Sequence, residues 1–182
     1  MTRKPIVMIM VMMIAAMTGC SPDGEETPSP QPVASTPTPT PSPQWTPEEQ
    51  GAIDAVQKYL EVWTNISQNL GTADWNQIRD VASDPAASDD VSIWTQWLGN
   101  GWHLVGAPGF IADSVALGGL DGQGQRYHVH GCYSIEGSYL VDSNGEQTGQ
   151  RGADRSIALY QVIKPSDDHY YVFEDGGEDT PC

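Results

Sequence analysis

Thr46-Pro47-Glu48-Glu49 opens the stretch that decides the fold, TPEEQGAIDAVQKYLEVWTNISQNL, residues 46–70. A threonine followed three residues later by a glutamate is a capping box, and proline is well suited to the first helical position because it has no N–H to leave unpaired. Apolar residues then recur at steps of three and four, at Ile53, Val56, Tyr59, Leu60, Trp63, Ile66 and Leu70. This spacing predicts a long helix with one apolar face, ended by Gly71.

The residues after this helix predict two shorter helices and then a series of strands. We expect helices from about 74 to just before Pro85 and from about 88 to 98, the second closed by Gly99. Short β-rich runs follow at 110–117, 125–135, 139–141, 156–164 and 170–174. Residues 142–145 and 165–168 are turn sequences that favour antiparallel neighbours. Helices followed by a meander of strands indicate an α+β domain, with helices covering one face of a curved antiparallel sheet.

The N-terminus has the three parts of an export signal. Basic Arg3 and Lys4 precede an apolar run from Ile6 to Met17, and this run of 12 residues is shorter than the roughly 20 that span a bilayer as a helix. The following Met17-Thr18-Gly19-Cys20 resembles the lipobox of bacterial lipoproteins. That resemblance implies that residues 1–19 are a signal peptide and that the Cys20 thiol carries the lipid. The alternative is a secreted protein with a coincidental cysteine after its signal.

Residues 20–45 combine the candidate lipid anchor with a spacer. Eight prolines stand here among Ser, Thr, Gln and Glu, with few apolar residues, so the segment cannot build a core. Proline favours an extended path of about 3.1 Å per residue. We therefore expect a linker that carries a single domain, residues 46–182, on the extracytoplasmic face of the cell membrane.

The charge balance excludes one class of partner. The 182 residues include 8 basic and 24 acidic side chains, a formal net charge of −16. Nucleic acid binding requires clusters of Lys and Arg against phosphates, and the sequence has none. The same charge opposes adsorption to an anionic lipid surface, so membrane attachment is expected to come from the lipid on Cys20.

Two cysteines remain besides Cys20. In an exported chain, Cys132 and Cys182 predict a single disulfide that ties the last residue to the middle of the domain. The alternative is a pair of free thiols.

Several segments together suggest a family. They are the long capped helix containing Tyr59-Leu60-Glu61-Val62-Trp63, and the later segments Gly131-Cys132-Tyr133, Val141-Asp142-Ser143-Asn144-Gly145 and Tyr171-Val172-Phe173. In this order they resemble the NTF2-like superfamily, and within it small exported lipoproteins of high-GC Gram-positive bacteria. The resemblance implies a cone-like fold whose hollow serves as a pocket, in enzymes such as ketosteroid isomerases or in non-catalytic binding modules. Fold alone does not decide between the two.

Metal binding has one candidate site. Alternation along a strand places His128, His130 and Cys132 on one face, where two imidazoles could share a metal ion. A disulfide would remove Cys132 as a ligand, and no further ligand motif supports the site. The alternative is that these histidines lie on a solvent-facing side of the sheet. On balance we expect no metal and no other cofactor.

Acid–base catalysis has only scattered candidates. Asp74, Asp80, Asp113 and His103 fall near the ends of predicted elements, where each is equally explained as a helix cap or a surface residue. No nucleophile, zinc or phosphate-loop motif accompanies them. The sequence therefore assigns no catalytic residue.

Two functions remain open from the sequence. The first is a non-catalytic module, anchored through Cys20, that binds a protein or cell-envelope partner. The second is a small-molecule carrier or acid–base enzyme that uses the pocket, or weak metal binding through His128 and His130. An open cavity with converging buried polar groups would favour the second, and a cone filled by aromatic side chains the first.

Overall fold

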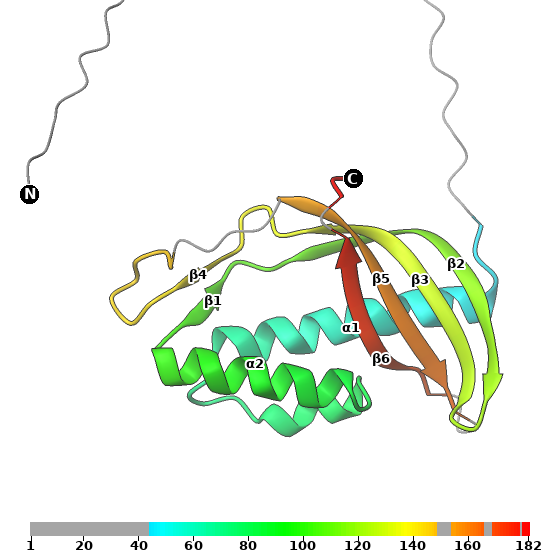
Figure 1. Cartoon of the computed structure of the whole chain (residues 1–182), viewed down its shortest axis with the longest axis horizontal. Coiled ribbons are helices and arrows are strands. Elements are labelled where there is room, and N and C mark those ends of the chain that lie inside the picture. The colour runs from blue at the N-terminus through cyan, green and yellow to red at the C-terminus, as the bar shows by residue number, and fades with distance from the viewer. Residues whose placement is uncertain (1–43, 149–153, 166–168, 179) are drawn as a thin grey trace, which may run out of the picture. The chain divides into compact units, whose positions relative to one another are not determined.

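The computed structural model describes residues 44–148, 154–165, 169–178 and 180–182 (Figure 1). The predicted signal peptide 1–19, Cys20 and nearly all of the linker 20–45 lie outside the described residues. The domain has the expected α+β composition, with helices first and strands after them. The helices are α1 (Pro47–Gln68), the 3-10 helix η1 (Trp75–Asp80) and α2 (Ala86–Asn100). The strands are β1 (His103–Val105), β2 (Gly109–Asp121), β3 (Gly124–Ser134), β4 (Tyr139–Val141), β5 (Arg155–Lys164) and β6 (Tyr171–Glu178).

Helix α1 begins as its sequence predicts. The Thr46 side chain accepts a hydrogen bond from the Glu49 backbone N–H at 3.3 Å, and the Glu49 carboxylate accepts one from the Thr46 N–H at 2.7 Å. The helix ends at Gln68, before the predicted stop at Gly71. Directly after the helix, the carbonyl of Asn69 accepts hydrogen bonds from the N–H groups of Thr72 and Ala73, and this turn directs the chain away from the helix axis.

Helix α2 is longer than predicted at both ends. It starts at Ala86, directly after Pro85, and runs through Gly99 to Asn100. Gly101, with φ of 70°, takes the left-handed position that ends the helix. A glycine inside a helix costs only about 1 kcal/mol, so the first glycine after an apolar run need not be the one that terminates it.

The main sheet is antiparallel, in the order β2-β3-β5-β6. Residues 166–168 of the second predicted turn lie outside the described residues, but the strands on either side of it, β5 and β6, are antiparallel neighbours as predicted. The inference that the turn at 142–145 makes the two flanking runs neighbours is wrong. The turn itself forms, because the Gly145 N–H donates a hydrogen bond to the Asp142 carbonyl at 3.0 Å. However, β4 before the turn does not pair with β5 after it: β4 pairs with β1, a strand that was not predicted, in a separate two-stranded sheet.

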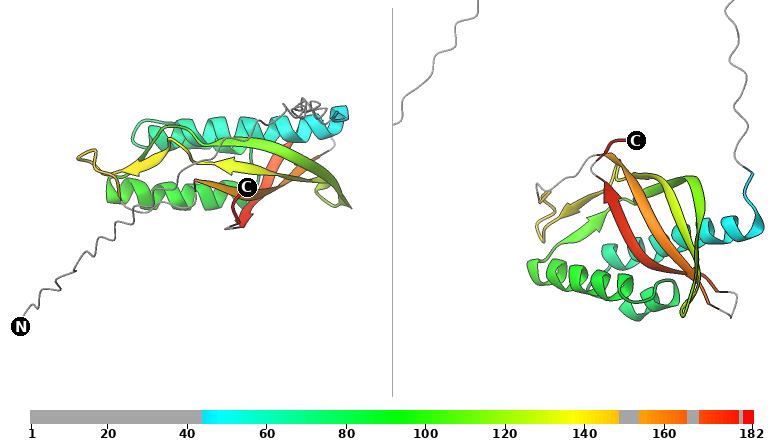
Figure 2. Two further views of the ribbon diagram at one scale, coloured as in Figure 1. Left: turned by 90° about the horizontal axis from the view of Figure 1, so that it is seen from above. Right: turned by 45° about the vertical axis from the view of Figure 1, so that its right-hand side comes forward.

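Both helices cover the same face of the main sheet, which curves over α1 (Figures 1 and 2). Along β3, Tyr127 and Val129 are buried toward the helices, while the alternating residues His128 and His130 point to the other face. Trp94 of α2 is fully buried, and its indole N–H donates to the Ser67 hydroxyl of α1 at 2.8 Å. This shared core fixes the two helices relative to the sheet.

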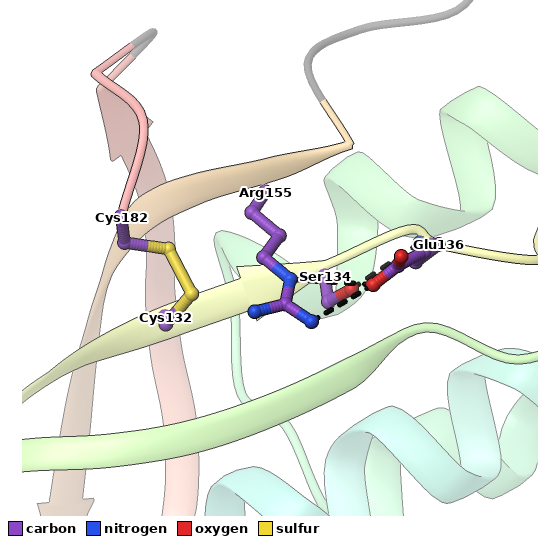
Figure 3. Close-up of a disulfide and its surroundings, with 5 residues drawn as sticks. All are labelled: Cys132, Ser134, Glu136, Arg155 and Cys182. Atoms are coloured by element: carbon purple, nitrogen blue, oxygen red, sulfur yellow. Dashed lines mark hydrogen bonds and ion pairs between the residues drawn. A yellow bond between two sulfur atoms is a disulfide. The ribbon is translucent and has the colours of Figure 1, made fainter. Parts of the chain in front are cut away.

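The predicted disulfide between Cys132 and Cys182 is present (Figure 3). It links β3 to residue 182. Just before Cys182 the chain lies beside β5, where the Thr180 carbonyl accepts a hydrogen bond from the Ile157 N–H at 3.0 Å. Close by, Arg155 of β5 forms an ion pair with Glu136 at 2.9 Å (Figure 3). The C-terminus is thereby held against the sheet.

Within the part of the chain that the structure describes, none of the helices combines the length and the apolar character needed to cross a bilayer.

Candidate functional site

A cavity of about 420 Å³ lies where α1 and α2 face the strands β3, β5 and β6. Its volume is within the roughly 300–1,000 Å³ of small-ligand pockets. Four aromatic and two acidic residues carry its chemistry: Tyr59, Trp63, Tyr133, Tyr160, Asp90 and Asp175. Small and aliphatic residues complete the described wall: Leu60, Ile93, Ser156, Ala158, Gly176 and Gly177. We refer to this cavity as the acidic pocket.

Asp90 is the central polar group of the acidic pocket. It lies on α2 with 4% of its surface exposed. The Tyr59 hydroxyl donates to one carboxyl oxygen at 3.0 Å, and the Trp63 indole N–H donates to the other at 2.8 Å. Tyr59 and Trp63 are four residues apart on α1 and so share one helix face. The carboxyl is therefore held in one orientation by two donors from the facing helix.

Burial governs the ionisation of Asp90. The pKa of the carboxyl rises from 3.8 to about 7. Loss of water around it is the largest cause and the negative charge of Asp175 acts in the same direction, while the hydrogen bonds from Tyr59 and Trp63 lower the pKa. Near neutral pH both the charged and the protonated form of Asp90 are therefore populated.

Asp175 brings a second carboxyl to the acidic pocket from β6, where it pairs with Tyr160 of β5. Although much of the residue is exposed, surrounding protein withdraws water from its carboxyl and raises its pKa, as do the charges of Asp89 and Glu174. Burial raises the pKa of the phenols around the cavity, and the negative charge of Asp175 raises it as well. The pKa of Tyr133 rises to about 12. The phenols therefore stay neutral, and among the described lining residues the two carboxyls alone supply charge.

The aromatic rings form an ordered wall. Tyr59 and Tyr160 meet edge to face with ring centroids 6.2 Å apart. Phe110 of β2 packs behind Tyr160, also edge to face, at 5.1 Å. Such pairs are preferred aromatic geometries, and they limit the freedom of the rings. The cavity is lined by aromatic side chains without being filled by them.

The residues that the sequence analysis offered for catalysis lie elsewhere. Asp74 caps η1, accepting from the Asn76 N–H at 3.0 Å, and Asp113 lies on β2, where it accepts from the Ser114 hydroxyl. Asp80 ends η1, and His103 begins β1. None of the four is among the described residues that line the acidic pocket.

The proposed metal ligands do lie on one face of β3. His128 and His130 share the outer face with Cys132, as alternation predicts, but Cys132 is committed to its disulfide. Over the described ranges, no group of three or more His, Cys, Asp or Glu side chains is placed to hold a metal ion.

Sequence reasoning missed both carboxyls of the acidic pocket. A signal for Asp90 existed, since it lies four residues after Ala86 and four before Trp94, on the buried face of α2. Asp175 had no such signal, because the register of β6 against β5 shifts between Gln161 and Val162. After the shift Glu174 bonds to the outward Gln161, and Asp175 faces the cavity.

Comparisons with known proteins add a fold and no function. No protein-family model and no curated protein matches the chain. Among solved structures, the crystal structure of the intermembrane space region of chloroplast protein ARC6 is similar, with a TM-score of 0.52 and 15% sequence identity. The match covers 74% of this chain and 98% of that one. At this identity the similarity supports the α+β fold alone.

Proposed function

We propose that this chain is an extracytoplasmic lipoprotein, anchored through Cys20, whose domain binds a small ligand in the acidic pocket without transforming it. The observation that carries the proposal is the cavity of about 420 Å³ around a buried, doubly hydrogen-bonded Asp90. The sequence of residues 1–20 supports the anchor, with its basic start, apolar run and lipobox-like end.

The NTF2-like resemblance is part of this proposal. Supporting it are the long α1 beneath a curved antiparallel sheet (Figure 2) and a cavity between helix and sheet, where members of that superfamily have theirs. The ARC6 region bears on neither the ligand nor the family.

Small-molecule binding fits the site better than the protein or envelope partner that the sequence analysis placed first. A module that only docks partners has no need of an open internal cavity, and burying a carboxyl is costly unless hydrogen bonds or a ligand compensate. Tyr59 and Trp63 supply the hydrogen bonds, and the cavity leaves room for the ligand.

Acid–base catalysis is the second candidate, favoured by the pKa of Asp90 near 7, which suits a general base. Binding is preferred because both oxygens of Asp90 already accept hydrogen bonds from the protein. A base engaged by two donors is a weaker proton acceptor than a free one.

The proposal is tested by titrating purified protein with a panel of cationic, anionic and neutral small molecules, following tryptophan fluorescence and melting temperature. We expect saturable binding that quenches or shifts Trp63 emission, abolished by Ala158→Phe, which fills the cavity. Ala116→Phe adds the same ring at an exposed position of β2 and should bind like the wild type. A panel with no saturable ligand, or equal binding by both variants, would contradict a pocket function, and turnover of a bound compound would favour the enzyme.

A further inference from the structure

We propose that the acidic pocket is a receptor for a small organic cation, an amine or quaternary ammonium, held between the carboxylates of Asp90 and Asp175 and the faces of the surrounding aromatic rings. The inference rests on the proposed ligand-binding function and names the class of ligand.

Charge is the first argument. The pocket brings together two carboxyls from different elements, α2 and β6, and its described lining contains no Lys, Arg or His. The charge of Asp175 opposes the ionisation of Asp90, and a cation between the two would remove that opposition. An anion would meet repulsion from both carboxylates. The formal charge of −16 on the whole chain also draws cations toward the protein.

The aromatic wall is the second argument. Tyr59, Trp63, Tyr133 and Tyr160 all line the cavity, and the faces of Trp and Tyr rings attract cations through their quadrupoles. Grouped aromatic rings with nearby acids are the arrangement by which proteins hold ammonium groups that carry no N–H donor. Burial strengthens the attraction because less water competes for the charge.

The same groups disfavour a bare metal ion. Calcium requires six to eight oxygen ligands and magnesium six in a near-ideal octahedron. Both oxygens of Asp90 are already oriented by Tyr59 and Trp63, and aromatic carbon makes up much of the remaining wall. A cation that gains from carbon contact as well as from charge suits this lining better.

The experiment compares choline with 3,3-dimethyl-1-butanol, which has the same shape with carbon in place of the charged nitrogen. Calorimetric titrations at about pH 8, where Asp90 is ionised, and about 150 mM salt, which screens long-range attraction, should give choline at least a tenfold tighter Kd. Tetramethylammonium serves as a second cation. Comparable binding of the neutral isostere, or tighter binding of an anion, would overturn the cation assignment and leave a ligand pocket standing.

Variants locate the binding. Asp90→Asn should weaken choline binding at least tenfold, whereas Asp89→Asn, the same charge change on the exposed neighbour, should change it little. Tyr133→Phe should retain most of the affinity and Tyr133→Leu should lose it, because the ring face and not the hydroxyl contacts the cation. Asp175→Asn, at an exposed position where folding is not at risk, should weaken binding as well. If Asp90→Asn, Asp175→Asn and Ala158→Phe all bind choline with wild-type affinity, the cation binds elsewhere on the surface, and both proposals are overturned.

Discussion

Asp90 is subject to opposing influences at a single carboxyl. Burial favours its protonated form, and the donors on Tyr59 and Trp63 favour its charged form. Burial prevails, since the pKa rises to about 7. Folding therefore changes the protonation of Asp90 between about pH 4 and pH 7, and its contribution to the free energy of unfolding depends on pH in that range.

The first prediction concerns this pH dependence. Between pH values near 4 and near 7, folded Asp90 retains a proton that its unfolded form, with a pKa of 3.8, has released. Folding is thus favoured by low pH in this range, and the free energy of unfolding falls as pH rises toward 7 and levels off above it. At about 1.4 kcal/mol per pKa unit, the loss from Asp90 is on the order of a few kcal/mol.

The measurement is urea denaturation of wild type and Asp90→Asn between about pH 5 and pH 8. All other side chains are the same in both proteins, so the difference between the two curves reports Asp90 together with its coupling to Asp175. Asp121 and Asp142 have lowered pKa values and stay ionised throughout, so they do not enter. Parallel curves for the two proteins would show that Asp90 is not the group responsible.

The second prediction concerns the Tyr59 hydroxyl. Tyr59→Phe leaves one buried oxygen of Asp90 without its donor, so we expect the pKa of Asp90 to rise and the protein to lose about 1–3 kcal/mol of stability. The loss should be larger at about pH 8 than at about pH 5, because the carboxylate needs the donor more than the acid does. Tyr160→Phe is the control, since it removes a hydroxyl from the same cavity and leaves both oxygens of Asp90 bonded. A loss that does not change with pH would contradict the role of this hydrogen bond.

Among the secondary-structure elements, predictability followed the strength of local signals. The capping box and the three-and-four spacing of α1 depend on near neighbours in sequence, and the start of the helix was predicted at the right residue. Strand β4 was predicted with its observed bounds, but its pairing with β1 was not predicted. Pairing brings together residues that are distant in sequence, so no local pattern in β4 specifies its partner. The last strand was predicted to end at Glu174, yet β6 continues through Glu178.

The third prediction links that end of β6 to the disulfide. Cys182 is bonded to Cys132 on β3 (Figure 3). The end of β6, Gly176 to Glu178, pairs with β5, and Gly176 and Gly177 line the acidic pocket. Closing a loop with a sequence separation of 50 residues stabilises the fold by about 4 kcal/mol in the chain-entropy model. We expect the double variant Cys132→Ser, Cys182→Ser to melt several degrees lower and to bind its ligand more weakly.

Thiol titration and melting curves with and without reductant check this prediction. The wild type should show no reaction at these two cysteines until it is reduced, and reductant should not change the melting temperature of the double variant. Breaking the ion pair of Arg155 with Glu136, which lies beside the disulfide on the surface, is a matched control and should cost less than about 1 kcal/mol. Unchanged ligand affinity in the double variant would separate the disulfide from the pocket.

For the whole molecule, the described domain and the N-terminal region carry separate parts of the proposed function. All described residues that line the acidic pocket belong to the compact unit Pro41–Cys182. The proposed anchor lies in the first twenty residues, far from the pocket in sequence. Localisation and ligand binding should therefore be separable by mutation.

The fourth prediction tests this separation through Cys20→Ala. Without the thiol there is no site for the diacylglyceryl group, and the apolar run of 12 residues is too short to span a bilayer as a helix, so the variant should not be stably held on the membrane. Cells labelled with a fatty-acid analogue should incorporate label into the wild type and not into Cys20→Ala, while Cys132→Ser remains labelled. The variant should keep wild-type ligand affinity, because the pocket contains no residue from the N-terminal region among those described. Label and membrane association that persist in Cys20→Ala would rule out Cys20 as the anchor and leave the pocket proposal intact.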